Sequence, residues 1–346
     1  MKVDYFIVGL GLAGLAFVEE LIANDKSFIV FENASQTSSL VAGGVYNPVI
    51  LKRFTPVWNA SKQLEIALPF YSELEDKFNT NFDKKFLTKK VFNSIEDQNN
   101  WFGAIDKYNI SKYLDDQLDH AKYQGIISQF GFGNVKQTGR VDTKELVKTY
   151  RLFLKKEKKI IFETFDYNQI KFSENIINYK TFSANRVVFS EGFGLKQNPF
   201  FNYLPLTGVK GETIIIYAPD VLIDFQIKSS VFVLPLGNNY FKIGATFNRL
   251  DKTSTPTKEG KQELIDKLSK VVDVPYKIIE HTAGVRPTVK DRRPLLGNHP
   301  IHKNLFVLNG LGTRGVMIAP TMAKQLYNYI ENKEMLDEEV DIKRFI

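Results

Sequence analysis

A glycine-rich turn near the N-terminus constrains the fold more than any other feature of this sequence. The apolar segment 2–8 is rich in β-branched and aromatic residues and predicts a buried strand. It runs into Gly9, Gly11 and Gly14, after which the apolar residues take a helical spacing. The first glycine permits a tight turn, the second lets a pyrophosphate approach the backbone, and the third lets the helix pack closely on the strand. The segment therefore predicts a strand, turn and helix that bind the phosphates of a dinucleotide.

A carboxylate follows at the spacing that such a unit requires. The next apolar run, residues 27–31, ends at Glu32, which stands 18 residues after Gly14. Glu32 can accept a hydrogen bond from a ribose hydroxyl and repels a 2′-phosphate, which favours FAD or NAD over NADP. We predict that Leu12 and Ala13 contact the cofactor together with the three glycines and Glu32. The alternative is a structural turn without a ligand.

The rest of the chain contains two kinds of strand. Residues 186–190 and 305–308 are apolar runs typical of buried parallel strands, whereas residues 212–217, 230–234 and 240–245 alternate and are separated by turn residues, as in an antiparallel sheet. A length of 346 residues allows about two domains. We therefore predict an α/β protein, α+β overall, in which a Rossmann-like domain with a parallel sheet is interleaved with a second domain built on an antiparallel sheet.

The predicted boundaries follow from where each kind of pattern begins and ends. Helical patterns at 56–78, 144–159 and 312–330 accompany the strands, and the polar stretch up to residue 113 has no strong periodicity. The predicted cofactor-binding domain comprises residues 1–55, 138–200 and 283–346, and the predicted substrate-binding domain comprises residues 56–137 and 201–282.

The amino-acid composition excludes several kinds of site. The sequence has no cysteine, which excludes disulfides, thiolate metal sites and a cofactor attached through sulfur. The four histidines lack metal-ligand spacing, so we assign no metal. We expect no membrane span, because no run of about 18 apolar residues is present, and we expect a cytoplasmic location. The net charge of +7 is modest and suits anionic ligands or RNA.

The C-terminal part carries short motifs in a defined order. The segment AGVRP at 283–287 comes first, a buried-strand pattern follows, and the segment GTRGV at 312–316 opens a helix. Together with the N-terminal turn, the loop 39–48 and a strand that ends at residues 191–192, this series resembles the FAD-dependent amine oxidoreductases of the D-amino-acid oxidase and glycine oxidase superfamily. The resemblance extends over nearly the whole chain.

The resemblance implies that the cofactor is FAD. Its attachment is expected to be noncovalent, because the loop 39–48 has no histidine and the chain has no cysteine. Gly43 and Gly44 of that loop would let the backbone lie against the isoalloxazine ring. The helix that begins near Arg314 would direct its free amides at the edge of the ring, where the arginine would stabilise the reduced flavin. The other cofactor contacts expected from these segments are Gly192, Gly312, Thr313, Gly315 and Val316.

The resemblance also implies a reaction. Arg286 would pair with a substrate carboxylate, and Lys242 would lie near the flavin and help oxygen accept electrons. The expected activity is oxidation of the C–N bond of an amino acid or secondary amine by hydride transfer to flavin N5, followed by hydrolysis of the imine, with oxygen as the favoured acceptor. A structural ion pair for Arg286 and an exposed strand position for Lys242 are the alternatives.

Other functions remain open. The forms of residues 310–315 and 46–48 also resemble the oxidoreductase domain of a bifunctional tRNA wobble-uridine modification enzyme, which would make tRNA a partner. Glu191 replaces the small residue usual before Gly192 in the family, which leaves open a flavin-binding protein without turnover. A plain NAD dehydrogenase is disfavoured, because nothing resembles a nicotinamide catalytic domain. The particular amine and the oligomeric state are not indicated.

Overall fold

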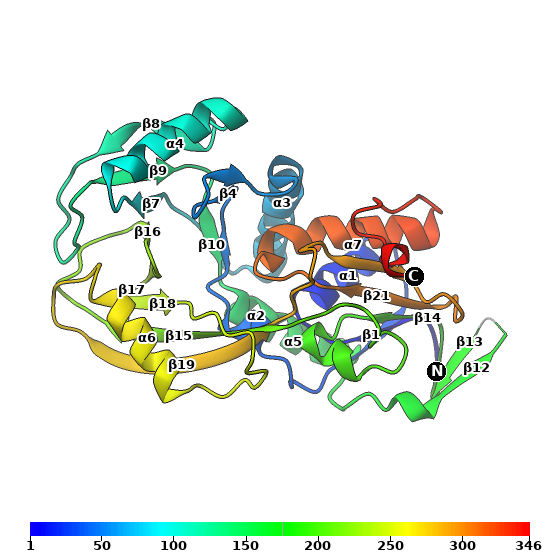
Figure 1. Ribbon diagram of the computed structural model, residues 1–346. Coiled ribbons are helices and arrows are strands. Elements are labelled where there is room, and N and C mark those ends of the chain that lie inside the picture. The colour runs from blue at the N-terminus through cyan, green and yellow to red at the C-terminus, as the bar shows by residue number, and fades with distance from the viewer. Residues whose placement is uncertain (175) are drawn as a thin grey trace.

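Two large sheets, of eight strands each, lie side by side in the protein (Figure 1). The computed structural model describes residues 1–174 and 176–346. The strands of the first sheet, in spatial order, are β11 (Ile160–Ile161), β2 (Phe28–Phe31), β1 (Lys2–Val8), β14 (Phe182–Phe189), β13 (Ile176–Tyr179) and β12 (Ile170–Ser173), with β21 (Leu305–Asn309) beside β14 and β20 (Leu295–Asn298) beside β21. Its centre is parallel, because β2, β1, β14 and β21 run in one direction. The predicted parallel sheet is confirmed.

The first sheet separates two apolar layers. Successive side chains of a strand point to opposite faces, so Tyr5 and Ile7 of β1 face the helices while Phe6 and Val8 face a cluster rich in aromatic rings. The cluster with Tyr5 and Ile7 takes its other members mainly from α1 (Leu12–Ala23), α3 (Ala60–Phe78), α5 (Thr143–Lys156) and α7 (Gly315–Glu331). This layered packing holds the first helix tightly on the strand that precedes it.

The second sheet is antiparallel except for one parallel pair, β16 with β7. Its strands, in spatial order, are β19 (Lys277–Arg286), β15 (Val209–Tyr217), β18 (Tyr240–Gly244), β17 (Phe232–Gly237), β16 (Gln226–Lys228), β7 (Thr88–Val91), β9 (Phe132–Val135) and β8 (Leu114–Asp119). Helix α6 (Lys258–Leu268) packs on one face through Leu264 and Leu268, which join Ile214, Ile243 and other strand residues in a buried cluster. The opposite face of the sheet is therefore free to form a wall of the site.

The remaining elements are short. They are α2 (Ser38–Val41), the strands β3 (Val45–Tyr46), β10 (Gly139–Val141) and β6 (Asp83–Lys85) of a small sheet, the pair β4 (Val49–Ile50) and β5 (Thr55–Pro56), and the 3₁₀ turns Tyr167–Gln169, Gly192–Gln197 and Ile342–Phe345. Among the described residues, no helix has both the length and the apolar character needed to cross a bilayer.

Two elements differ from expectation. Helix α4 (Ile95–Tyr108) lies in the stretch that lacks strong periodicity, since only Trp101, Ala104 and Ile105 of its residues are buried. The sequence of residues 159–164 also favours a strand, but only two of these residues form one, β11, which pairs with β2 at the edge of the sheet. An edge strand needs only one partner, so sequence periodicity overestimates its length.

Candidate functional site

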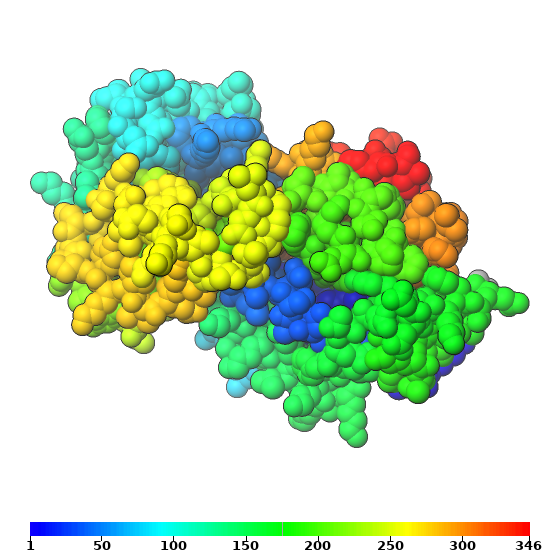
Figure 2. Space-filling model, turned by 60° about the horizontal axis from the view of Figure 1, so that its bottom comes forward, coloured from blue at the N-terminus to red at the C-terminus, as the bar shows by residue number. Residues whose placement is uncertain are grey.

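A cavity of about 1060 Å³ is lined by residues of both sheets and of the loop 38–52. This volume lies slightly above the usual range for ligand pockets. It reaches the surface, because some of its lining residues are exposed, among them Asn33, Ser35, Lys196, Gln197, Lys252 and Ser254. Figure 2 shows this face, with the N-terminal segment in blue between yellow and green parts of the chain. Every predicted cofactor residue except Gly14 lines the cavity, and so does Arg286, whereas Lys242 is not among its lining residues.

The N-terminal turn has the geometry that its glycines predict. Gly9 has a φ of +94°, and a Cβ there would lie 2.6 Å from the carbonyl oxygen of Ser190. A Cβ at Gly14 would lie 2.1 Å from the carbonyl oxygen of Gly9, so Gly14 serves helix packing. A Cβ at Gly11 would meet only Ser39 Oγ, at 3.1 Å, and Gly11 is the N-cap of α1 without a side-chain cap. The residues of this helix end, Gly11 to Ala13, line the cavity. The amide of Leu12 donates to Ser39 Oγ at 3.3 Å, and the helix N-terminus can bind phosphate.

Glu32 is buried beside this turn with partners of its own. Its Oε2 accepts a hydrogen bond from the backbone amide of Leu10 at 2.6 Å, and its Oε1 accepts one from Ala34 at 2.6 Å and from Arg151 at 2.9 Å. A carboxylate has about four acceptor positions, so one position on Oε2 stays available for a ribose hydroxyl. Arg151 was not found from the sequence, because it lies 119 residues from Glu32 along the chain.

The loop 42–45 and the start of α7 form the middle of the cavity. Gly44 has a φ of +68°, and a Cβ there would lie 1.9 Å from the carbonyl oxygen of Val141. A Cβ at Gly43 would lie 3.3 Å from the ring of Phe232 on β17. Arg314 is the N-cap of α7 and has no side-chain cap. A second helix N-terminus thus opens on the same cavity, where it would favour negative charge.

Two arginines line the cavity without an acidic partner among the described residues. The terminal nitrogens of Arg286 donate only to the carbonyl oxygen of Thr246, at 3.3 and 3.4 Å. Arg314 donates to the carbonyl oxygen of Asn47 at 3.0 Å. Burial lowers the pKa of both guanidinium groups, that of Arg314 to about 10. Because a buried charge is costly without a counter-charge, both side chains are suited to an anionic ligand.

Lys242 contacts the loop that the sequence predicts to bind the flavin, and it does not line the cavity. Its Nζ donates to the carbonyl oxygen of Ala42 at 3.1 Å. Burial, and then the charge of Arg140, lower the pKa of Lys242 to about 8. The lysine therefore supports the backbone next to Gly43, and its catalytic role stays a prediction.

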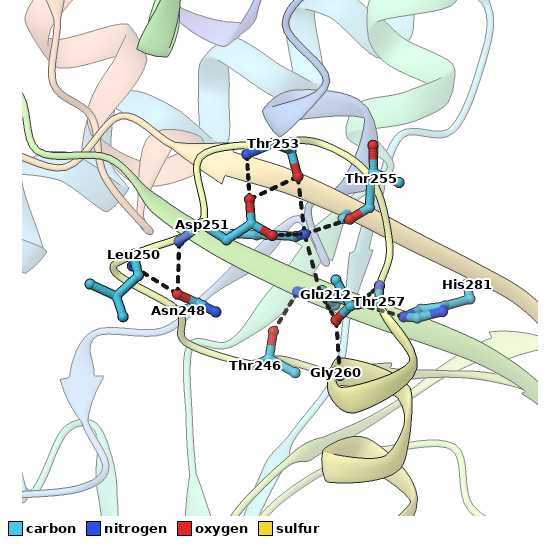
Figure 3. Close-up of polar contacts among 12 residues, drawn as sticks. Glu212, Thr246, Asn248, Leu250, Asp251, Thr253, Thr255, Thr257, Gly260 and His281 are labelled. Atoms are coloured by element: carbon cyan, nitrogen blue, oxygen red, sulfur yellow. Dashed lines mark hydrogen bonds and ion pairs between the residues drawn. The ribbon is translucent and has the colours of Figure 1, made fainter.

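The segment 246–257, which connects β18 to α6, is tied to β15 by buried polar groups (Figure 3). Lys210 is fully buried, and its Nζ lies 2.5 Å from Asp251 Oδ2 and 2.5 Å from the carbonyl oxygen of Thr255. The backbone amide of Glu212 donates to Thr246 Oγ1 at 2.8 Å. These contacts fix the Thr246 carbonyl that Arg286 meets. Sequence reasoning missed the network because its members are about 40 residues apart in the chain.

A family model described as FAD dependent oxidoreductase matches residues 4–328. The chain belongs to this family. It is accordingly an enzyme whose cofactor is FAD. The site fits that cofactor, because two uncapped helix ends face the cavity and the buried Oγ of Ser190, one of its lining residues, has no hydrogen-bond partner among the described residues. Leu12, Gly312, Thr313 and Val316 line the cavity at these helix ends, and Gly192 does so beside Ser190.

Curated relatives match part of the chain. Glycine oxidase of Bacillus subtilis is 26% identical over 149 residues, which cover 41% of this chain and 40% of that enzyme. The tRNA 5-methylaminomethyl-2-thiouridine biosynthesis bifunctional protein of Idiomarina loihiensis is 27% identical over 129 residues, which cover 36% of this chain and 21% of that protein. The match therefore spans less than half of either relative.

Solved structures match almost the whole chain. Glycine oxidase from Geobacillus kaustophilus has a TM-score of 0.77 at 19% identity, over 97% of this chain and 96% of that one. Iminodiacetate oxidase from Chelativorans sp. BNC1 has a TM-score of 0.75 at 16% identity, over 97% of this chain and 98% of that one. At these identities the likeness establishes a shared fold.

Proposed function

We propose that this enzyme oxidises the C–N bond of an amino acid or secondary amine. The observation that carries the proposal is Arg286, a partly buried arginine that lines the cavity. Its guanidinium contacts one backbone carbonyl but no carboxylate among the described residues. The planar, forked guanidinium matches a carboxylate in geometry and charge. The names of the relatives, glycine oxidase among them, support an amino acid as the substrate class.

Arg286 would hold the substrate carboxylate and so fix the position of the neighbouring amine and α-carbon. Bound FAD would supply the acceptor for the hydride that leaves the α-carbon. The resulting imine would be hydrolysed by water to an oxo acid and ammonia or a primary amine. An amine that binds in its neutral form needs no protein base for this step, which agrees with a cavity whose carboxylates all have partners on the chain.

We infer that oxygen accepts the electrons and is reduced to hydrogen peroxide. Arg314 would stabilise the negative charge of the reduced cofactor, since it has no acidic partner among the described residues. Lys242 would add positive charge beside Ala42 and Gly43. We also infer a cytoplasmic location, which a chain without cysteine permits.

The test is anaerobic reduction of the bound cofactor. The purified protein is expected to be yellow, and its visible absorbance is expected to bleach with at least one of glycine, sarcosine, D-amino acids or proline. Readmission of oxygen should restore the colour and release hydrogen peroxide. A protein that binds no flavin after reconstitution, or one that never bleaches with any amine, would overturn the proposal.

A secondary amine carried on tRNA is the second candidate, favoured by the match to the Idiomarina loihiensis protein. Salt-sensitive binding of tRNA, and bleaching by modified tRNA but not by free amino acids, would support this candidate. Efficient turnover of a free amino acid would decide against it.

A further inference from the structure

Strand β16 places two hydrogen-bond donors on the cavity wall that the sequence analysis did not find. Gln226 and Lys228 are two residues apart, so their side chains lie on the same face of the sheet, and both line the cavity. Gln226 Oε1 accepts from Thr88 Oγ1 at 3.0 Å. Within the described part of the chain, neither the amide nitrogen of Gln226 nor Lys228 Nζ has a hydrogen-bond or ion-pair partner. The wall therefore presents donors for which the protein supplies no acceptor.

The charged side chains near Lys228 give it no acidic partner among the described residues. Its cross-strand neighbours are Phe232 on β17 and Lys90 on β7, and Lys90 already pairs with Asp97 at 2.9 Å. Burial, and then the positive charges of Lys90 and Lys267, lower the pKa of Lys228 to about 8. A bound anion would reverse this cost, because an opposite charge within a few ångströms favours the protonated amine.

The acids that line the cavity are engaged elsewhere. Glu32 pairs with Arg151, Glu163 pairs with Lys180 at 2.7 Å, and Glu191 accepts a hydrogen bond from Asn198 at 2.7 Å. None of them forms an ion pair with Lys228 in the described residues. Both donors are therefore available to an acceptor on a ligand that enters the cavity.

Lys228 and Gln226 lie well away from Arg286. The guanidinium of Arg286 lies over β15, since a Cβ at Gly211 would be 2.0 Å from its Nη2. Strands β18 and β17 separate β15 from β16, and three strand spacings amount to roughly 14 Å. Between them the ring of Phe232 lines the same cavity. A ligand that reaches both cations would need an anion at each end and an apolar middle.

We propose that Lys228 and Gln226 form a second anion subsite, which binds an acidic group at the far end of the substituent on the substrate amine. The preferred substrate is then an N-substituted amino acid that carries two acidic groups. This inference rests on the proposed function, because it takes Arg286 as the site of the first carboxylate.

Two matched probes test the subsite. N-hexylglycine and N-(5-carboxypentyl)glycine both carry the glycine carboxylate and a six-carbon tail, but only the second has an acid at the end of the tail. The wild-type enzyme should show a higher kcat/KM for the acid-tailed probe. Lys228→Met should lower that kcat/KM by about tenfold or more, as expected for the loss of one charge-assisted hydrogen bond, and should leave the value for N-hexylglycine nearly unchanged.

Two further variants test whether the charge of Lys228 causes the preference for the acidic tail. Lys228→Arg should keep most of the preference for the acidic tail, because it keeps the charge. Lys267→Met removes a nearby positive charge that pairs with Glu263 on α6 and does not line the cavity, so it should leave the preference intact. Equal losses with both probes in Lys228→Met, or loss of bound FAD from this variant, would overturn the subsite and show that the lysine serves the fold or the cofactor.

Failure of the proposed function would be recognised separately. If no amine bleaches the wild-type flavin, neither the two probes nor glycine, sarcosine, D-amino acids or proline, the amine oxidation is wrong, and binding still tests the subsite. The visible spectrum of the FAD-loaded protein would then be titrated with N-(5-carboxypentyl)glycine. A Kd that rises about tenfold in Lys228→Met supports the subsite, and an unchanged Kd, or no binding to the wild type, overturns it.

Discussion

Lys210 and Asp251 form an ion pair in which the lysine is completely buried and its Nζ lies 2.5 Å from Asp251 Oδ2. The pair fastens the segment 246–257 to β15, one strand from the arginine that we propose to bind substrate. The carbonyl oxygen of Thr246, at the start of that segment, accepts hydrogen bonds from both terminal nitrogens of Arg286. The ion pair thereby contributes to the position of a side chain that it does not touch.

Lys210→Met is expected to disturb that position. The variant removes the ion pair between the buried lysine and Asp251 and the hydrogen bond to the Thr255 carbonyl, which should lower the free energy of unfolding. It should also raise KM for carboxylate substrates more than it lowers kcat. Urea denaturation and steady-state kinetics measure the two effects. Asp251→Asn, which keeps an acceptor oxygen for the lysine, should show the smaller change in KM. A fall in kcat at constant KM in Lys210→Met would contradict the positioning role.

Arg286→Ala tests the carboxylate contact itself. The variant should lose on the order of 100-fold in kcat/KM for amines that carry a carboxylate, because it removes a charged, forked donor. Amines without a carboxylate should be affected far less. Arg286→Lys keeps the charge without the fork and should fall between the two. Equal losses for charged and uncharged amines would reject the contact.

Gly11→Ala and Gly14→Ala should separate cofactor binding from folding. A methyl group at Gly14 would lie 2.1 Å from the carbonyl oxygen of Gly9, whereas one at Gly11 would meet only Ser39 Oγ at 3.1 Å. Gly14→Ala is therefore expected to lower the thermal stability of the apoprotein markedly. Gly11→Ala should leave the apoprotein nearly as stable and weaken FAD binding, as measured by titration of flavin fluorescence. Similar apoprotein stabilities for both variants would argue against these separate roles.

Glu191 should make stability depend on pH. Burial raises its pKa from 4.5 to about 7, against the opposing hydrogen bonds from Asn198 and Tyr167. The folded state therefore keeps a proton that the unfolded chain releases above about pH 4.5, so the stability contributed by neutral Glu191 falls as the pH rises through 7. Glu191→Gln cannot ionise.

The measurement is urea denaturation of both proteins between pH 4.5 and 8. The advantage of Glu191→Gln over the wild type should grow across this range to a plateau above pH 7, of up to about 3 kcal/mol. An advantage that does not change with pH would show that Glu191 does not titrate in this range.

The same variant also tests whether a carboxylate at this place lowers FAD affinity at high pH.

Local patterns predicted much of the fold. The turn at Gly9, the strands β1, β14 and β21 and the helix α7 follow from glycine positions and apolar periodicity, both of which act within a few residues. Helix α4 and the short edge strand β11 were missed or misjudged, because their stability comes from contacts with distant segments.

The sequence by itself determined the binding turn, the two kinds of sheet and the arginines that belong to a recognisable motif, because backbone conformation and motif spacing are local properties. Only the tertiary structure decided which charges have partners. Lys210 forms an ion pair with Asp251, 41 residues away in the chain, which neutralises its charge. Lys228 and Arg286 have no acidic partner in the described chain. Both lysines look alike in the sequence, since ion pairing depends on what folding brings within a few ångströms. The tertiary structure thus distinguishes Lys210, which holds a loop in place, from Lys228, which we propose to bind an anion.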